Sequence, residues 1–438
     1  MIAWDAARVA EAAGATLLEA APGGPARAAI DTRALAPGDL FVGLTGEHVD
    51  GGRFAAAALM AGAWGVLVSP AFASGLSGGA VLVADDPLAA LQRLATAWRR
   101  ELGAAVIGVT GSVGKTSTKQ LIAALVSPWR RVAANPANFN TEIGLPLAVL
   151  AAPAGTEVLV LEMGMRGFGQ IDELARIAEP DVGVITNVGP VHLELVGSLE
   201  GVAAAKGELL AHVPVAVIPG DEPLLEPYLR PELDVVRVGA DVVLEAFDPP
   251  HASIRARELP VALAVPFTAR HQLRNLLTAV GAAQAVGVEP SGVVDVSFGP
   301  LRGERVELPS GVVIINDCYN ANPLSMRAAL DDLATQAPTG GRRVAVLGDM
   351  LELGAGEAAE HESVGAYAAS AGVDVLVAVG PLSAAAMPGA FGGASFVASD
   401  AGEAAAVASS VVRPGDTVLV KASRGIGLET VAEALARG

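Results

Sequence analysis

Cysteine is almost absent from this sequence, and long apolar runs are absent too. The 438 residues contain one cysteine, Cys318, so no disulfide framework can form within the chain and a reducing compartment is expected. Glycine or charged residues interrupt every apolar run well short of the ~18 residues that a membrane span needs. The first 14 residues also lack the apolar core of a signal peptide. We therefore expect a cytoplasmic protein with no membrane insertion.

Positive charge is also scarce, and lysine is the scarcest cation. The formal net charge is -18, which argues against nucleic acid as the main partner, so bound phosphate must be held by local geometry. Only four of the 29 Lys+Arg residues are lysines, namely Lys115, Lys119, Lys206 and Lys421. Lys206 is therefore either an ordinary surface residue or a group whose chemistry a guanidinium cannot perform.

Apolar strands alternate with helical segments along most of the chain, which predicts an α/β fold with parallel, doubly wound sheets. The length fits roughly three domains. We place a small α/β domain at residues 1–84, a central P-loop-type domain with a mostly parallel sheet at 85–298, and a Rossmann-like α/β domain at 299–438. The strands of the last two include AAVIGVT, EVLVLEM, DVGVITNV, GVVIIND, RRVAVLGD and DTVLVKA.

The strongest local signal is TGSVGKTS, which follows the apolar strand AAVIGV and opens a helix. Backbone N–H groups of such a loop hold phosphate oxygens, Lys115 reaches the outer phosphates, and the Thr116 hydroxyl can ligate Mg²⁺. The loop reads TGxxGKT rather than GxxxxGK[ST], and the alternative is a glycine turn without function. The predicted nucleotide-binding residues of the loop are Thr110, Gly111, Ser112, Val113, Gly114, Lys115, Thr116 and Ser117.

Two further strand ends point to the same edge of the sheet. Glu162 ends the strand EVLVLE, and His192 follows the strand DVGVITNV. Because ligands bind at the carboxyl ends of parallel strands, both residues are candidate metal ligands beside the phosphate loop. Alternatively, Glu162 pairs with an arginine and His192 is a hydrogen-bonded structural residue.

An ordered series of motifs resembles the ATP-dependent Mur ligases of peptidoglycan synthesis, and the resemblance covers essentially the whole chain. The series is TGSVGKTSTK, NPANFNTEIGLPL, LEMG, TNVGPVHLELVGSLEGVAAAKGELL, RHQLRNLLTAVGAA, NDCYNANPLSM, GDMLELG and VLVKASRG. Within this family, NDCYNANP and NFNTEIGLPL resemble the branch that adds D-alanyl-D-alanine to UDP-N-acetylmuramoyl-tripeptide. The sequence lacks the DNPR stretch of the diaminopimelate-adding branch.

The resemblance implies an ATP-dependent peptide ligase that works through an acyl phosphate. It implies ATP and two Mg²⁺ ions as cofactors, with Lys206 carbamylated by CO₂ to give a carboxylate-like metal ligand. The implied catalytic residues are Lys115, Glu162, His192 and Lys206, and the implied metal ligands are Thr116, Glu162, His192 and Lys206. Asn275, Arg305 and Asp317 match residues that hold the nucleotide.

The same resemblance assigns the substrate contacts. The residues that match UDP-sugar contacts are Asp31, Thr32 and Arg33. The residues that match contacts to the peptide and the dipeptide are Asn138, Asn140, Asn320, Asn322, Lys421, Ser423 and Arg424. The implied partners are UDP-N-acetylmuramoyl-tripeptide and D-alanyl-D-alanine, and we expect a monomer. The third residue of the acceptor peptide, diaminopimelate or another diamino acid, stays open.

Three alternatives compete with this interpretation. A sister amide ligase, such as a folylpolyglutamate-synthase-like enzyme, would share the phosphate loop, and a non-catalytic relative would bind nucleotide without turnover. The stretch KASRGIG resembles the glycine-rich turn of short-chain dehydrogenases, but only seven residues follow Val431. No room is left there for the acidic residue of a dinucleotide site.

Overall fold

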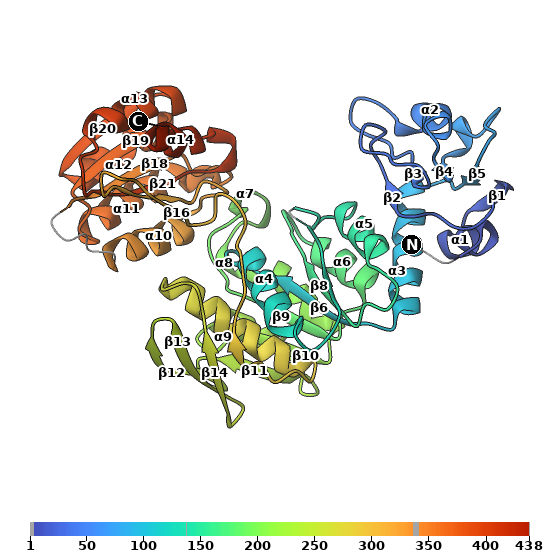
Figure 1. Ribbon diagram of the computed structural model, residues 1–438, viewed down its shortest axis with the longest axis horizontal. Helices are drawn as coiled ribbons and strands as arrows, with labels where there is room; N and C mark the ends of the chain where they lie inside the picture. Colours follow the sequence, from blue (N-terminus) through green and yellow to red (C-terminus); the bar gives the residue numbers. More distant parts are fainter. Residues whose placement is uncertain (1–3, 137, 336–340, 438) are drawn as a thin grey trace.

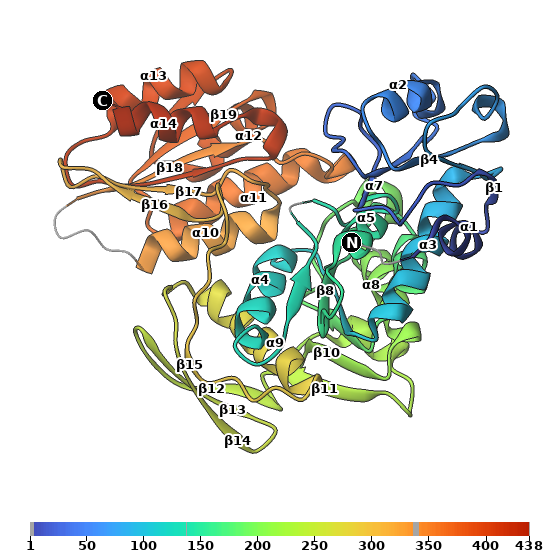
Figure 2. The same ribbon diagram turned by 45° about the vertical axis from the view of Figure 1, so that its right-hand side comes forward.

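The protein consists of three α/β units, each built on one sheet, in a computed structural model that describes residues 4–136, 138–335 and 341–437. Figure 1 shows the N-terminal unit in blue and the C-terminal unit in orange and red on opposite sides of the central unit. In Figure 2 both outer units lie above the central sheet. The predicted α/β class and the three-unit layout are confirmed. No helix in the described part of the chain is long and apolar enough to cross a membrane.

The N-terminal unit has a five-stranded sheet in the order β1-β5-β4-β3-β2, parallel except for β1. Its strands are β1 (Thr16–Glu19), β2 (Ala28–Ala29), β3 (Leu40–Val42), β4 (Gly65–Val68) and β5 (Ala80–Val83). Its helices are α1 (Ala6–Ala13), α2 (Ala55–Met60) and the 3-10 turns η1 (Gly51–Phe54) and η2 (Pro70–Phe72).

Helix α3 (Pro87–Leu102) joins the N-terminal unit to the central one through shared apolar packing. Asp86 caps its first turn by accepting a hydrogen bond from the Ala89 N–H, and Gly103 ends it in the left-handed conformation. Leu94 and Trp98 of α3 belong to one buried cluster with Leu82 of β5 and Val106 of the central sheet. The first two units therefore share a continuous hydrophobic core.

The central unit has a ten-stranded sheet in the order β15-β14-β13-β12-β11-β10-β9-β6-β8-β7. Its strands are β6 (Ala105–Thr110), β7 (Val132–Ala134), β8 (Val158–Glu162), β9 (Val182–Ile185), β10 (Val215–Pro219), β11 (Asp234–Val238), β12 (Val242–Asp248), β13 (His251–Ala256), β14 (Leu259–Ala264) and β15 (Gly292–Val293). Its helices are α4 (Lys115–Val126), α5 (Gly144–Ala151), α6 (Gln170–Ala178), α7 (Leu193–Val196), α8 (Leu199–Gly207), α9 (Arg270–Ala285) and the 3-10 helices η3 (Glu208–His212) and η4 (Pro223–Tyr228).

Helices cover both faces of the central sheet, so successive strand residues enter different cores. Val106 packs in the cluster with α3, α5 and α6, whereas Ile107 and Val109 pack in the cluster with α4 and α9. Burial on both faces explains why these strands are continuous apolar runs. The predicted parallel arrangement is confirmed for β7, β8, β6, β9, β10 and β11.

The far edge of the central sheet departs from the predicted alternation. Strands β12, β13 and β14 form an antiparallel meander whose turns lie at residues 249–250 and 257–258. Its faces differ, because β13 alternates between exposed or half-buried residues and fully buried ones. This period of two is typical of a sheet with one solvated face.

The C-terminal unit has a six-stranded sheet in the order β16-β17-β21-β18-β19-β20, parallel except for β16. Its strands are β16 (Glu304–Glu307), β17 (Val313–Asn316), β18 (Arg343–Gly348), β19 (Val375–Val379), β20 (Ala394–Ala398) and β21 (Thr417–Lys421). Its helices are α10 (Pro323–Thr335), α11 (Glu357–Ser370), α12 (Pro381–Phe391), α13 (Ala401–Val411), α14 (Glu429–Arg437) and the 3-10 turns η5 (Gly354–Gly356) and η6 (Arg424–Ile426). Val344 and Val346 face one apolar cluster, and Ala345 and Leu347 face another.

Candidate active site

The glycine-rich loop after β6 has a shape that other residues could not adopt. Gly111 and Gly114 have φ values of 147° and 81°, which favour glycine. A Cβ on Gly111 would lie 1.9 Å from the Thr186 hydroxyl oxygen. Helix α4 begins at Lys115, directly after the loop, so its free N–H groups face the same space as the loop amides.

The end of β9 holds the loop in this shape. The Val113 N–H donates to Asn187 Oδ1 at 2.9 Å, and Asn187 Nδ2 and Thr186 Oγ1 donate to the Val113 carbonyl at 2.9 and 2.6 Å. Register pairing of Thr110 with Ile185 places the two strand ends side by side. The sequence analysis did not assign this supporting role, although TN directly follows the strand VGVI.

Lys115 lies across the loop that it follows. Its ammonium donates to the Gly111 carbonyl at 2.7 Å. Burial lowers the pKa of Lys115, the Arg302 charge lowers it further, and the Glu162 carboxylate opposes both. A flexible side chain held by one carbonyl can exchange that contact for a phosphate oxygen.

Glu162, which is 3% exposed, ends β8 beside the loop. Its Oε2 accepts a hydrogen bond from Thr116 Oγ1 at 2.8 Å, and its Oε1 accepts one from Asn140 Nδ2 at 2.9 Å. The Lys119 ammonium lies 3.4 Å from Oε2 and donates to the Asn135 carbonyl. A hydroxyl and a carboxylate thus meet at the phosphate loop, and oxygen ligands of this kind suit Mg²⁺.

Lys206 lies in α8 and is 2% exposed, so the surface alternative is wrong. It donates no hydrogen bond to any residue that the structure describes. Burial lowers its pKa well below the ordinary value, and the charge of Lys115 adds to this effect. Its amine is therefore disposed to be neutral.

His192 is affected by the same two lysines. Burial lowers the pKa of His192, and the charges of Lys115 and Lys206 lower it further, against the opposing effect of Glu352. His192 Nδ1 lies 2.9 Å from Glu352 Oε2. Within residues 4–136, 138–335 and 341–437, no three His, Cys, Asp or Glu side chains form a metal-binding group. A cation here would need other ligands, such as the Thr116 hydroxyl, phosphate oxygens or a carbamate.

A cavity of about 560 Å³ lies between the central and C-terminal units, and residues of both units line it. The predicted residues that line it are Ser112, Val113, Gly114, Lys115, Thr116, Ser117, Asn140, Glu162, Asn275, Asp317, Asn320, Asn322 and Lys421. Nucleotide-loop residues and residues of the NDCYNANP loop therefore face one space.

Arg302 lines this cavity, whereas Arg305 is not among its lining residues. The Arg302 guanidinium lies 3.6 Å from the centre of the Tyr319 ring, and its Nη2 donates to Thr116 Oγ1 at 3.1 Å. Arg305 instead forms an ion pair with Asp332 at 3.2 Å. The sequence analysis assigned the nucleotide to Arg305 and missed Arg302.

Other cavity-lining residues also escaped the sequence analysis, although their stretch, RHQLRNLL, was quoted as a motif. Arg270, His271 and Arg274 come from the first turns of α9. Burial lowers the pKa of His271, against the opposing charges of Asp317 and Asp332. Asn275 lies close to Gly114, where an added Cβ would be 2.6 Å from Asn275 Oδ1.

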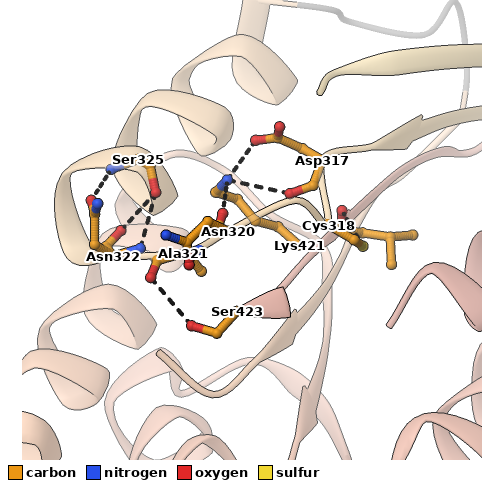
Figure 3. A network of polar contacts seen from close by, with 9 residues as sticks. Asp317, Cys318, Asn320, Ala321, Asn322, Ser325, Lys421 and Ser423 are labelled. Carbon is orange, nitrogen blue, oxygen red and sulfur yellow. Dashed lines mark hydrogen bonds and ion pairs between the residues drawn. The ribbon is translucent and has the colours of Figure 1, made fainter. Parts of the chain in front are cut away.

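On the C-terminal wall, Lys421 organises the NDCYNANP loop (Figure 3). Its ammonium donates to Asp317 Oδ2 at 2.6 Å, to the Asp317 carbonyl at 3.3 Å and to the Asn320 carbonyl at 2.9 Å. Asn322 Oδ1 accepts from the Ser325 N–H and so caps the first turn of α10. Ser423 Oγ accepts from the Leu351 N–H at 3.0 Å.

The remaining predicted residues do not line this cavity. Asp31 and Arg33 form an exposed ion pair, and the side-chain hydrogen bond from Arg33, followed by its backbone one, lowers the pKa of Asp31 to about 2. Arg424 pairs with Glu429. The predicted residues that do not line the cavity are Asp31, Thr32, Arg33, Thr110, Gly111, Asn138, His192, Lys206, Arg305, Ser423 and Arg424.

Comparison with known proteins identifies the class of protein that this fold and site define. Residues 109–283 match the Mur ligase middle domain, and residues 301–424 match the glutamate ligase domain of Mur ligases. The UDP-N-acetylmuramoyl-tripeptide–D-alanyl-D-alanine ligase of Bacillus subtilis is 38% identical over 93% of this chain and 92% of its own. The chain belongs to the Mur ligase family and, within it, to the UDP-N-acetylmuramoyl-tripeptide–D-alanyl-D-alanine ligases.

Solved structures agree with this assignment. A crystal structure of MurF from Acinetobacter baumannii has a TM-score of 0.88 at 27% identity, and each chain covers 99% of the other. The MurF ligase of Thermotoga maritima in complex with ADP has a TM-score of 0.80 at 29% identity, over 94% of this chain and 97% of that one. The chain is thus a ligase, and the oxidoreductase alternative is wrong. The stretch KASRGIG, which suggested that alternative, spans the end of β21 and the 3-10 turn η6.

Proposed function

We propose that the chain uses ATP to join D-alanyl-D-alanine to UDP-N-acetylmuramoyl-tripeptide, which gives the UDP-muramoyl-pentapeptide of peptidoglycan synthesis, ADP and phosphate. The observation that carries the proposal is the single cavity that the phosphate loop and the NDCYNANP loop share. The three domains would be residues 1–84, 85–298 and 299–438, and the protein would work as a cytoplasmic monomer.

The chain's own groups account for the phosphoryl step. The loop amides and the start of α4 bind the phosphates, and Lys115 exchanges the Gly111 carbonyl for an outer phosphate oxygen. The substrate carboxylate attacks the γ-phosphorus, ADP leaves and an acyl phosphate forms. Mg²⁺ supplies charge neutralisation for the transferred phosphoryl group when it is bound. Thr116 and Glu162 fit that ion, because their oxygens already lie 2.8 Å apart.

The second step joins the peptide units. The amine of the dipeptide attacks the acyl carbon, a tetrahedral intermediate forms, and inorganic phosphate leaves. Asn320, Asn322 and the carbonyls that Lys421 holds form the cavity wall opposite the phosphate loop. Cavity walls from two units exclude water from the acyl phosphate when they approach each other.

Lys206 would act as a carbamate in this scheme. Its neutral nitrogen attacks CO₂ and loses a proton, which converts the amine into a carboxylate-like group. Three features support the proposal: burial, a lowered pKa, and no hydrogen bond to any described residue. With His192, Glu162 and Thr116, the carbamate would complete sites for two Mg²⁺ ions.

The proposal is tested by release of ADP and phosphate. Both should require UDP-N-acetylmuramoyl-tripeptide, and phosphate should require D-alanyl-D-alanine for sustained turnover. Lys115→Ala should lose most turnover while the protein stays folded, because it removes the positive charge that binds the outer phosphates. If D-alanine alone supports turnover as well as the dipeptide does, the assignment to this branch is wrong.

A further inference from the structure

A close contact between a ring nitrogen and a carboxylate links the central unit to the loop after β18. His192, which precedes α7, places Nδ1 2.9 Å from Oε2 of Glu352, which precedes η5. The side chains are 26% and 53% exposed. An ion pair this exposed contributes little to stability, so the position of the groups is the feature to explain.

Both partners have an unusual backbone conformation. His192 has φ 52° and Glu352 has φ 65°, in the left-handed region that glycine favours. For other residues this conformation is strained, and it persists where surrounding structure enforces it, often at functional sites. Two such residues therefore meet across the boundary between two units.

Three separate elements fix the loop that carries Glu352. Asp349 Oδ1 accepts a hydrogen bond from the Ser383 N–H at 2.7 Å, at the start of α12. His361 Nε2, in α11, accepts one from the Met350 N–H at 2.9 Å. Ser423 Oγ, after β21, accepts one from the Leu351 N–H at 3.0 Å. The loop is therefore prearranged by the C-terminal unit.

The loop that carries Glu352 also approaches the chain next to His192. A Cβ on Gly354 would lie 3.5 Å from the Glu194 backbone and side chain, which is van der Waals contact. Gly354 itself has φ 66°. The loop and the segment that carries His192 thus fit against each other over several residues.

The chemistry of the bond selects one form of His192. A carboxylate has no proton to donate, so a ring nitrogen 2.9 Å from its oxygen is favourable when that nitrogen, Nδ1, carries the proton. In the neutral ring Nε2 then keeps its lone pair, which is the form that binds a cation. We propose that Glu352 is a positioning residue that orients His192 and fixes its tautomer, so that Nε2 can bind a divalent cation only when the C-terminal unit lies against the central one.

This inference rests on the proposed function for the identity of the cation and goes beyond it in assigning a role to Glu352. The first test is nitrogen-15 NMR of histidine, with the His192 signals assigned from the spectrum of His192→Asn. In the unmodified protein, Nδ1 should carry the proton. Glu352→Ala should shift His192 to a mixture of tautomers, whereas Glu352→Gln should keep the Nδ1–H form, because its amide oxygen still accepts.

The second test measures Mn²⁺ binding by electron paramagnetic resonance in the presence of ADP. Glu352→Ala should weaken the binding of one Mn²⁺ by about tenfold or more. Glu352→Gln should weaken it less. Glu362→Ala, which removes an exposed carboxylate from α11, is the matched control and should leave Mn²⁺ binding unchanged.

Two results would overturn the inference: an unchanged tautomer and Mn²⁺ affinity in Glu352→Ala, or tighter Mn²⁺ binding in that variant. The second result would mean that Glu352 withholds His192 from the cation. Neither measurement depends on turnover. An inactive protein with the expected tautomer would refute the proposed function alone, and an active protein without it would refute the role of Glu352 alone.

Discussion

Lys206 and Lys421 are equally buried, at 2% exposed each, but their surroundings differ. Lys421, at the end of β21, donates to three oxygens of Asp317 and Asn320. Lys206, in α8, donates to no described residue. A buried ammonium is costly unless it is paired. The comparison teaches that scarcity and burial mark a lysine as unusual, whereas its hydrogen-bond partners separate a structural cation from a reactive amine.

The largest expected effect concerns the activity of Lys206 variants. Lys206→Arg should be no better than Lys206→Ala, each about a thousandfold below the unmodified enzyme in kcat, because arginine cannot form a carbamate. Acetate or formate should partly restore Lys206→Ala and should not restore Lys115→Ala, which lacks a cation. An active Lys206→Arg enzyme would refute the carbamate and would make Lys206 an ordinary positive charge.

The next effect concerns stability. Lys421→Met should lower the free energy of unfolding of the C-terminal unit by about 2 kcal/mol, because it leaves the Asp317 carboxylate and the Asn320 carbonyl without their donor. Urea unfolding followed by circular dichroism measures this change. Unchanged stability in Lys421→Met would contradict the structural role and would favour the predicted contact with substrate.

Two arginines extend the comparison. Arg302→Met should raise the KM for ATP by about tenfold, since the guanidinium lies at Thr116. Arg305→Met removes the same charge three residues away, at the ion pair with Asp332, and should leave KM close to the unmodified value. Steady-state kinetics over a range of ATP concentrations gives both KM values. Equal changes in KM for the two variants would show that lining the cavity does not decide which arginine affects ATP binding.

The smallest effect is the most diagnostic of an unpartnered amine. Lys206→Met should change the free energy of unfolding by less than about 1 kcal/mol, because a side chain of similar length replaces an amine that makes no described hydrogen bond. The same urea experiment serves here, with Lys421→Met as the reference. A loss as large as that of Lys421→Met would reveal a partner for Lys206.

Local pattern predicted much of the fold and part of the site. The parallel strands and the phosphate loop could be predicted because each depends on residues that are adjacent in the sequence, as in β6 and the start of α4. The antiparallel meander β12–β14 was not predicted, because an alternation of strands and helices does not include three consecutive strands. The position of Glu162 at the end of β8, beside the phosphate loop, was predicted from the sequence, and its role as a metal ligand stays a prediction.

Contacts between distant residues were beyond that reasoning. Lys421 pairs with Asp317, 104 residues earlier, and Arg302 reaches Thr116 across 186 residues. Arg302 and Arg305 stand three residues apart in the sequence, and only the fold shows which of them faces the cavity. The assignments of His192, Lys206 and the substrate-binding residues stay predictions.

The placement of the four lysines has a practical consequence for chemical labelling. Lys119, Lys206 and Lys421 are each 2–3% exposed, and Lys115 is half-buried at the phosphate loop. Amine-reactive dyes and cross-linkers should therefore find few lysine side chains on the folded protein, and nucleotide should shield Lys115 as well. The number of lysines that react with such a reagent would therefore measure how far the structure has opened.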